Sequence, residues 1–233
     1  MHSSKKKIVV FSGAGISAES GLKTFRDQGG LWENHDISKV ATPQAWQANR
    51  EMVLQFYNMR RKQLFEAKPN PAHYAIAELE SHFEVEVITQ NIDDLHERAG
   101  STKVTHLHGE LKKVQSEKYP ELVYDFKKEA IEIGDLCEKG HQLRPHVVWF
   151  GEAVPMMEKA YQIATTADYF IVVGTSLNVY PAAGIVNFVL PTTKCWLVDP
   201  NSHNLQLGNQ WTIIQNKAGI ALPNLVEQLK NKA

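Results

Sequence analysis

Two histidines lie two positions apart near the middle of the chain, and their side chains could exchange protons at neutral pH. His106 and His108 fall in or next to a β-rich run, Val104–Leu107, and an extended backbone turns both side chains to one face. Only His108 precedes a glycine, Gly109, as expected where a strand ends in a loop. Such loops form active sites in open α/β sheets. His108 is therefore the candidate general base, because imidazole titrates near pH ~6.5.

A second candidate site follows the first β-rich run, Lys7–Phe11. The segment Gly13-Ala14-Gly15-Ile16-Ser17-Ala18 fits G-x-G-x-x-A, in which the glycines allow a tight turn and the approach of a pyrophosphate. The match alone is weak, and an ordinary glycine turn is the alternative. The polar residues Glu19–Gly30 that follow predict a mobile loop rather than a packing helix. In that loop Arg26 could neutralise phosphate charge and Phe25 could cover a ring, or both could be ordinary surface residues.

The elements that position these residues alternate between β-rich runs and amphipathic segments, which predicts an α/β fold with a doubly wound parallel sheet of the Rossmann type. Strands are expected at Lys7–Phe11, Glu84–Thr89, Val104–Leu107, His146–Trp149, Tyr169–Val173, Cys195–Asp199 and Thr212–Gln215. Helices are expected near Glu51–Phe65, Pro71–Ser81, Ile92–Ala99, Pro155–Thr165, Ala182–Leu190 and Leu222–Lys230.

Two regions interrupt this alternation. The stretch from Gly30 to Pro71 holds helix but no strand, and the stretch from Leu111 to Arg144 is charged and poor in strand signal. We expect one domain over residues 1–233, with a large lobe (1–30, 72–110 and 145–233) and a smaller inserted lobe (31–71 and 111–144).

Composition narrows the class of protein. With 25 basic and 26 acidic residues the net charge is −1, so neither nucleic acid nor a membrane surface is an expected partner. Only Cys137 and Cys195 are present, which excludes a disulfide framework and favours a reducing cytoplasm. The apolar run after the basic start ends at Phe11, too short for a signal peptide. The sequence does not indicate an oligomeric state.

Five motifs, in this order, resemble those of the sirtuin family. They are Gly13-Ala14-Gly15-Ile16-Ser17 with Phe25-Arg26-Asp27, Thr89-Gln90-Asn91-Ile92-Asp93-Asp94-Leu95-His96 with Ala99-Gly100, His108-Gly109-Glu110, Val148-Trp149-Phe150-Gly151-Glu152, and Gly174-Thr175-Ser176. The resemblance spans almost the whole chain. It implies a protein lysine deacylase whose NAD⁺ and acyl-lysine substrates meet between a Rossmann-type lobe and a small lobe.

The resemblance also implies which residues bind NAD⁺ as a cosubstrate. Ala14, Gly15, Arg26 and Ser176 would surround the phosphates, and Asp199 could accept bonds from the adenine ribose, which disfavours NADP. The full set is Gly13, Ala14, Gly15, Ser17, Glu19, Phe25, Arg26, Trp32, Gln90, Asn91, Ile92, Asp93, Gly174, Thr175, Ser176, Asp199, Pro200, Asn201 and Ala218.

Three polar side chains would lie around the nicotinamide and its ribose, namely Gln90, Asn91 and Asp93, and the last two join His108 as catalytic residues. Asn91 and Asp93 could instead be N-caps of a helix that begins near Ile92. In the implied reaction the acyl-lysine oxygen attacks the ribose C1′ and nicotinamide leaves. His108 then takes a proton from a ribose hydroxyl, and water releases lysine and O-acyl-ADP-ribose.

The substrate side of the site has two parts. Val148, Phe150, Gly151 and Glu152 resemble the segment that pairs with a peptide backbone, with Val179 on the other flank, although Val147-Val148-Trp149 could equally be a core strand. On the helix expected at Glu51–Phe65, Tyr57 and Arg60 share an apolar stripe.

Tyr57 and Arg60 are similar to the pair that marks the class III, desuccinylase and demalonylase branch of the family. A succinyl or malonyl carboxylate would satisfy both, and a charge-assisted bond of ~1.5–3 kcal/mol would favour succinyl over acetyl by roughly 10–100-fold. The alternative is an internal carboxylate paired with Arg60. Arg61, next along, is expected to point elsewhere and could be merely solvated.

The small lobe departs from the pattern of many sirtuins, which hold zinc there with four cysteines. Here Cys137 and His141 offer two ligands, and a closed structural site needs four, so no zinc is expected. Packing must then hold the lobe, and the candidate core residues are Tyr119, Leu122, Val123, Tyr124, Phe126, Ile131 and Ile133.

Two other functions remain open from the sequence. The same site could serve an ADP-ribosyltransferase or NAD glycohydrolase, which would release nicotinamide without an acylated peptide. A non-catalytic NAD-sensing module would bind without turnover, although His108, Asn91 and Asp93 together offer more polar chemistry than binding needs.

Overall fold

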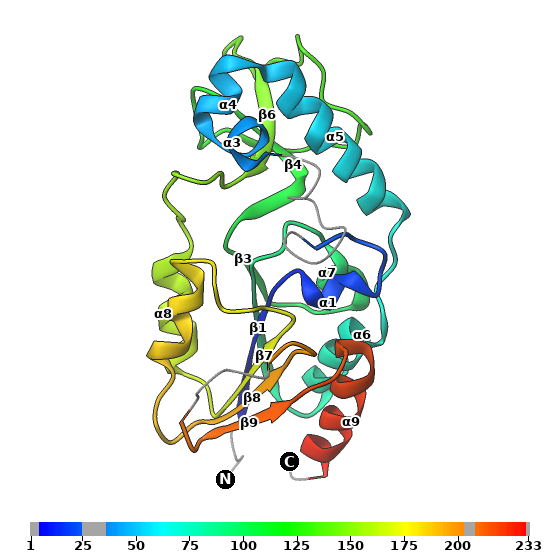
Figure 1. Ribbon diagram of the computed structural model, residues 1–233, viewed down its shortest axis with the longest axis vertical. Helices are drawn as coiled ribbons and strands as arrows, with labels where there is room; N and C mark the ends of the chain where they lie inside the picture. Colours follow the sequence, from blue (N-terminus) through cyan, green and yellow to red (C-terminus); the bar gives the residue numbers. More distant parts are fainter. Residues whose placement is uncertain (1–4, 25–35, 203–207, 232–233) are drawn as a thin grey trace.

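The computed structural model describes residues 5–24, 36–202 and 208–231. Its larger lobe is a parallel sheet of six strands, drawn in the lower half of Figure 1. These strands are β1 (Lys7–Ser12), β2 (Glu84–Thr89), β3 (Val104–His106), β7 (Tyr169–Val173), β8 (Lys194–Val198) and β9 (Trp211–Ile214). All six overlap strands that the sequence predicted.

The strand order is β3-β2-β1-β7-β8-β9, and every neighbouring pair is parallel. The order reverses between β1 and β7, where Phe11 lies beside Val172. This is the topology of a doubly wound Rossmann-type sheet, in which ligands bind at the carboxyl ends of the strands flanking the reversal. The predicted fold class is confirmed.

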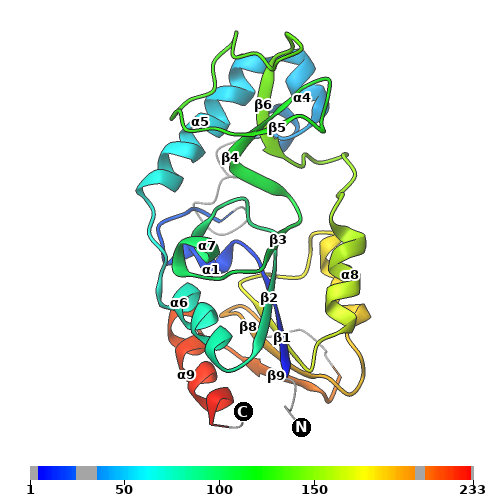
Figure 2. The same ribbon diagram turned by 180° about the vertical axis from the view of Figure 1, so that it is seen from behind.

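Helices cover both faces of the parallel sheet, as Figures 1 and 2 show. One face packs against α6 (Pro71–Glu78), the short helix η1 (Leu79–Ser81) and α9 (Ala218–Lys230). The other packs against α8 (Met157–Thr165) and the 3₁₀ helix η2 (Ala182–Phe188). Because both faces are covered, the central strands are fully buried, which explains the continuous apolar run Val9-Val10-Phe11.

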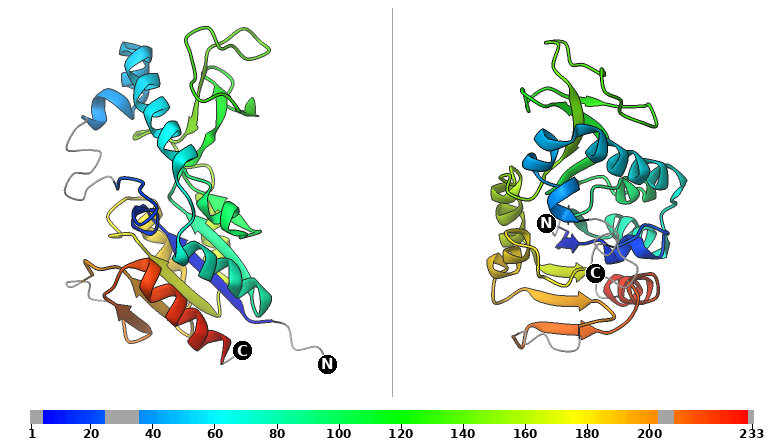
Figure 3. Two further views of the ribbon diagram at one scale, coloured as in Figure 1. Left: turned by 90° about the vertical axis from the view of Figure 1, so that its right-hand side faces the viewer. Right: turned by 45° about the horizontal axis from the view of Figure 1, so that its top comes forward.

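The smaller lobe is an antiparallel sheet in the order β5-β4-β6, packed against three helices (Figure 3). Its elements are β4 (Gly109–Ser116), β5 (Val123–Asp125), β6 (Leu143–Val147), α3 (Ile37–Val40), α4 (Pro43–Ala48) and α5 (Arg50–Glu66). The prediction of little strand between Leu111 and Arg144 is wrong. The register of β4 against β6 shifts between Glu110 and Val114, and such a bulge breaks the alternation by which a strand is detected.

Several other predicted elements differ in their bounds or type; for example, the helix expected at Leu222–Lys230 begins at Ala218. The strand expected at His146–Trp149 is β6, which ends at Val147 and belongs to the smaller sheet. The helix expected from Ile92 begins at Leu95 as α7 (Leu95–Ala99), and the helix expected from Ala182 is the 3₁₀ helix η2. A four-residue helix, α1 (Gly15–Ala18), follows the first glycine turn and was not predicted.

Buried polar side chains of α5 hold the loop between β5 and β6. The guanidinium of Arg61 is fully buried and donates hydrogen bonds to backbone carbonyls of Leu111, Phe126, Lys128 and Glu129. Arg61 does not line the cavity that Arg60 lines, but the alternative that it is solvated is wrong. Its charge is satisfied by four peptide dipoles rather than by water or a carboxylate.

Apolar packing in the smaller lobe follows the prediction only in part. Ile131 is buried, and Leu122, Tyr124 and Phe126 pack against the same core. Val123 and Ile133 are 37% and 54% exposed, so their prediction as core residues is wrong. Among the described residues no three His, Cys, Asp or Glu side chains are grouped to hold a metal ion.

No helix in the described part of the chain combines the length and the apolarity needed to cross a bilayer.

Candidate active site

A cavity of about 750 Å³ lies at the carboxyl ends of β1, β2, β7 and β8 and is closed on the other side by α5 and the segment after β6. This volume suits a cofactor together with part of a second substrate. The residues predicted for the site that line it are Gly13, Ala14, Gly15, Glu19, Tyr57, Arg60, Gln90, Asn91, Ile92, His108, Val148, Phe150, Gly151, Glu152, Gly174, Thr175, Ser176, Val179, Asp199, Pro200, Asn201 and Ala218.

Five predicted site residues are not among those lining the cavity. Ser17 and Asp93 are buried behind its wall. Phe25, Arg26 and Trp32 lie outside the described residues.

The two glycine turns at the sheet reversal pack directly on each other. Gly15 donates its N–H to the Gly174 carbonyl at 2.8 Å, and a Cβ at Gly15 would lie 2.8 Å from the Gly174 Cα. Gly174 itself has a φ of +63°, which disfavours a side chain. Glycine at position 15 is therefore explained by contact between two loops, in addition to any approach by a phosphate.

Asn91 is held by a buried polar network beneath the first glycine turn. Its side-chain amide donates to the Gly13 carbonyl and to the Ser17 hydroxyl, each at 3.2 Å. Ser17 in turn donates to the Asp93 carboxylate at 3.0 Å, and burial raises the pKa of Asp93. Asn91 precedes α7 by too many residues to cap it. Asp93 accepts from the Leu95 N–H at 3.2 Å, but the N-cap residue of α7 is Asp94, so neither Asn91 nor Asp93 is the N-cap.

The two histidines of the β3 region have different surroundings, although they share a face of the chain. The Nδ1 of His108 lies 2.9 Å from the Gln90 carbonyl oxygen. Since a carbonyl only accepts, Nδ1 carries the proton and Nε2 carries the lone pair. Burial lowers the pKa of His108, so its ring is neutral at pH 7. Both nitrogens of His106 contact acceptors instead, the Asn91 carbonyl and Glu97.

Tyr57 and Arg60 project from α5 to the wall of the cavity, one turn apart. Burial raises the pKa of Tyr57 to about 12, so its hydroxyl stays a donor. Burial lowers the pKa of Arg60, while the nearby Tyr57 and Asp93 act to raise it. A guanidinium and a phenol at one wall can together bind an anionic group.

The segment after β6 closes the cavity and is held by the chain itself. Val148 donates its N–H to the backbone carbonyl of His108 at 2.9 Å, and Phe150 donates its N–H to that of Ala41 at 3.0 Å. The Glu152 carboxylate accepts from Arg144 at 2.8 Å and from the Trp149 N–H at 2.7 Å. The Glu152 side chain therefore stabilises this turn.

The end of the cavity beside β8 is lined by Asp199 and Asn201, and Asp199 accepts the N–H of Asn201 at 2.8 Å. Glu19 also lines this end, but its carboxylate accepts from the Gly219 N–H in the first turn of α9 at 2.8 Å. An anion suits the positive end of a helix. The contact gives Glu19 a role in joining α1 to α9 as well as lining the cavity.

The model of the Sir2 family matches residues 13–181, which is most of the chain and includes the two glycine turns and His108. The chain belongs to the Sir2 family.

Curated members of the Sir2 family match over nearly the full length. A protein of Helicobacter pylori strain 26695 is 51% identical over 96% of this chain and 97% of its own length. One of Bacteroides thetaiotaomicron is 47% identical over 96% of this chain and 98% of its own length. Both are named NAD-dependent protein deacylase. This chain is an enzyme of that class, an NAD-dependent protein deacylase.

Solved structures of Sir2 homologues match the fold over nearly the full length of this chain. A mutant Sir2 homologue in complex with ADP-ribose is 38% identical, with a TM-score of 0.89, over 98% of this chain and 93% of that one. A Sir2 homologue in complex with NAD gives a TM-score of 0.87 at 38% identity, over 98% and 91%. Sir2Af2 bound to a myristoylated histone peptide gives 0.72 at 35% identity, over 98% and 92%.

The cavity of this Sir2 enzyme also has lining residues that the sequence did not single out. They include Ala41, Phe56, Val154 and Lys217. Phe56 precedes Tyr57 on α5 and could have been suspected from that position. The others carry no reactive group in a recognisable pattern, and only the folded chain brings them to the cavity.

Proposed function

We propose that the cavity binds NAD⁺ and an acylated lysine of a protein or peptide, and that His108 is the catalytic base. The observation that supports this most is the hydrogen bond from His108 Nδ1 to the Gln90 carbonyl. It selects the tautomer whose Nε2 can accept a proton, on a side chain that lines the cavity. The depressed pKa of His108 keeps that lone pair available at neutral pH.

The cavity wall suits each part of NAD⁺ by its chemistry. The turns at Gly13–Gly15 and Gly174–Ser176 meet at the sheet reversal, where dinucleotide phosphates bind in Rossmann-type sheets. Asp199 and Asn201 follow β8 and suit ribose hydroxyls. The amide of Gln90, steadied by the Thr175 hydroxyl at 3.1 Å, suits the nicotinamide side. When bound, NAD⁺ supplies an electrophilic ribose carbon with nicotinamide as leaving group.

His108 accepts a proton from a ribose hydroxyl, which makes that oxygen nucleophilic toward the acyl carbon. The adjacent Asn91, held by Gly13 and Ser17, orients the ribose. Asp93 acts through Ser17 by fixing the hydroxyl that Asn91 contacts. General-base help of this kind contributes ~10²–10⁴-fold to the rate.

We propose further that the enzyme belongs to the class III branch and prefers succinyl or malonyl groups over acetyl. The supporting residues are Tyr57 and Arg60, which offer a hydroxyl donor and a guanidinium at one wall of the cavity. We also propose that the small lobe is stable without zinc and that the enzyme is cytoplasmic, in keeping with two free cysteines.

One assay tests the reaction and another tests the acyl group. Nicotinamide release from NAD⁺ is measured with and without a succinylated peptide, and release should require the peptide. Equal release without peptide would favour a glycohydrolase. The ratio of kcat/KM for succinyl over acetyl versions of one peptide should fall roughly 10–100-fold in Arg60→Met. Lys62→Met, an exposed charge on the same helix, is the matched control and should keep the ratio.

A further inference from the structure

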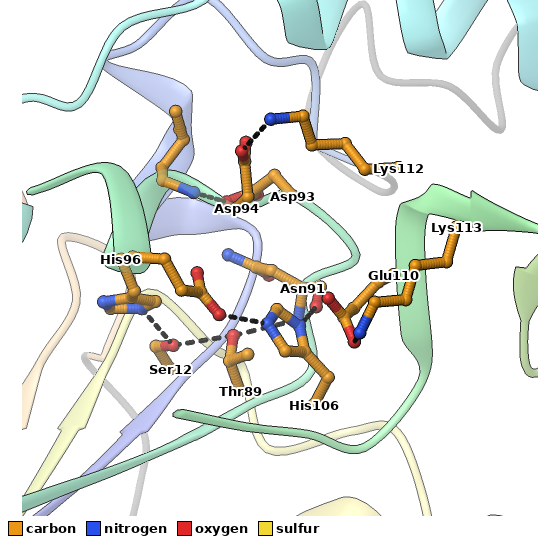
Figure 4. Close-up of polar contacts among 12 residues, drawn as sticks. Ser12, Thr89, Asn91, Asp93, Asp94, His96, His106, Glu110, Lys112 and Lys113 are labelled. Carbon is orange, nitrogen blue, oxygen red and sulfur yellow. Dashed lines mark hydrogen bonds and ion pairs between the residues drawn. The ribbon is translucent and has the colours of Figure 1, made fainter. Parts of the chain in front are cut away.

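His106 is buried beside the proposed site but does not line the cavity. Its side chain is 7% exposed, and each ring nitrogen contacts an oxygen. Nδ1 lies 2.9 Å from the Asn91 carbonyl, and Nε2 lies 2.8 Å from the Glu97 carboxylate on α7. Figure 4 shows the ring between these two contacts, with Asn91 and Glu110 beside it. His106 thus joins α7 to the loop that carries Asn91.

The two partners determine the charge of this ring. A backbone carbonyl and an ionised carboxylate are acceptors only, so both hydrogen bonds exist together only when both ring nitrogens carry protons. His106 is therefore an imidazolium when the arrangement is complete. His108, two residues later, has one such acceptor and is neutral. The pair holds opposite protonation states within one short segment.

Other ionisable groups around His106 favour the same state on balance. Burial acts to lower the pKa of His106, but the hydrogen bond and charge of Glu97, the Asn91 carbonyl and the charge of Glu110 outweigh it, and the pKa lies above its usual value. Asp93 also interacts with the ring by charge. His96 and His146 are the other titratable neighbours, and burial lowers the pKa of each, so neither competes as a cation at neutral pH.

The Asn91 backbone is held on both sides by this arrangement. The Thr89 hydroxyl accepts the Asn91 N–H at 3.0 Å, and His106 donates to the Asn91 carbonyl. When His106 loses its second proton, either the Asn91 bond or the Glu97 bond loses its hydrogen. The ring nitrogen that faces Glu97 would then oppose a carboxylate, which is repulsive. The position of Asn91 is therefore coupled to the protonation of His106.

We propose that His106 is a positioning residue, which as an imidazolium clamped by Glu97 holds Asn91 in place for NAD⁺. The inference rests on the proposed role of Asn91. It adds that the enzyme needs one histidine charged and another neutral. Activity then falls at acid pH as His108 gains a proton and at alkaline pH as His106 loses one.

Glu97→Gln tests the clamp, because glutamine can donate to Nε2 of a neutral His106 while Nδ1–H still reaches Asn91. In the wild type, the KM for NAD⁺ should rise about three- to tenfold on the alkaline side, the equivalent of one lost hydrogen bond. In Glu97→Gln that rise should stay below about twofold. His106→Gln, which cannot titrate, should likewise lose the alkaline rise.

Glu110→Gln is the matched control, since Glu110 affects His106 by charge without bonding to it. In that variant the alkaline rise should persist and move to lower pH. Imidazole NMR gives a readout independent of turnover. The pKa of His106 should lie above ~6.5, with both ring nitrogens protonated at pH values below that pKa. In Glu97→Gln its pKa should fall.

Two results would overturn the inference. The first is that His106 titrates below pH ~6.5. The second is that the KM for NAD⁺ rises on the alkaline side in Glu97→Gln and His106→Gln as it does in the wild type, while only the melting temperatures of the variants change. Either would leave the proposed function intact. Failure of the wild type to release nicotinamide with an acyl-peptide would reject the proposed function instead, and the NMR titration would still decide the charge state of His106.

Discussion

The guanidinium of Arg61 on α5 donates a hydrogen bond to the carbonyl oxygen of Lys128, in the loop between β5 and β6, at 2.6 Å. Asn58, one turn earlier on α5, exchanges two hydrogen bonds of 2.9 Å with the backbone of Ile131. The same helix presents Tyr57 and Arg60 to the cavity. The loop after β5 and one wall of the proposed acyl site are thus held by adjacent residues of one helix.

Replacing Arg61 should destabilise the small lobe strongly. Arg61→Met removes the donor of four backbone carbonyls, in one buried and three partly buried hydrogen bonds. The free energy of unfolding should fall by about 3 kcal/mol or more, since an unsatisfied buried group costs about 1–3 kcal/mol. Arg61→Lys should lose less stability than Arg61→Met, because its ammonium can still donate hydrogen bonds but lacks the planar fork of a guanidinium. Denaturant unfolding measures both, with Lys62→Met as the exposed control.

A chelator should leave the wild-type melting temperature unchanged, and a large drop would show that a metal holds the lobe.

His108→Ala should lose deacylation by roughly 10²–10⁴-fold while keeping its fold, because the proposed base is removed from a cavity wall rather than from the core. Turnover with a succinylated peptide measures the loss of activity, and the circular dichroism spectrum checks that the fold is kept. The control is His82→Ala, which removes an exposed imidazole and should retain full activity. Undiminished turnover in His108→Ala would remove the base assignment.

A buried histidine pair should make the protein less stable in acid. His73 and His96 are both fully buried with their rings 5.1 Å apart, and burial lowers the pKa of His73 to about 4. The unfolded chain binds protons below pH ~6.5, where the folded chain does not, so the free energy of unfolding falls as pH drops from about 6.5 toward 4. For His73 alone the loss is on the order of 3 kcal/mol.

Urea unfolding between pH 8 and pH 4.5 measures this loss. His73→Gln should flatten the slope over that range, since its side chain takes up no proton. An identical slope in the variant would assign the acid sensitivity to other groups.

Gly15→Ala should disturb the meeting of the two glycine turns, because the new Cβ would lie 2.8 Å from the Gly174 Cα. Backbone on both sides must then move, at a cost of about 1–3 kcal/mol. We expect a lower melting temperature and a higher KM for NAD⁺. Gly184→Ala is the control, since a Cβ there meets nothing within 4 Å. Equal behaviour of the two variants would argue against tight contact between the turns.

Local patterns predicted the large lobe well. The buried strands β1, β2 and β7 are continuous or alternating apolar runs, and their bounds were predicted within one residue. The antiparallel β4 was missed because its bulge at Glu110 to Val114 hides the period of two. The burial of Arg61 could not be predicted, because sequence spacing shows on which face of a helix a side chain lies but not which other segment packs against that face.

The sequence by itself determined the family, the glycine turns and His108 as candidate base, because reactive groups and tight turns require particular residue types at short spacings. The tertiary structure decided which of the titratable groups are protonated. His106 and His108 look alike along the chain, and only folding gives one of them a carboxylate at the second nitrogen. Protonation depends on hydrogen-bond partners that folding brings from distant segments, and a local sequence pattern does not show which partners these are.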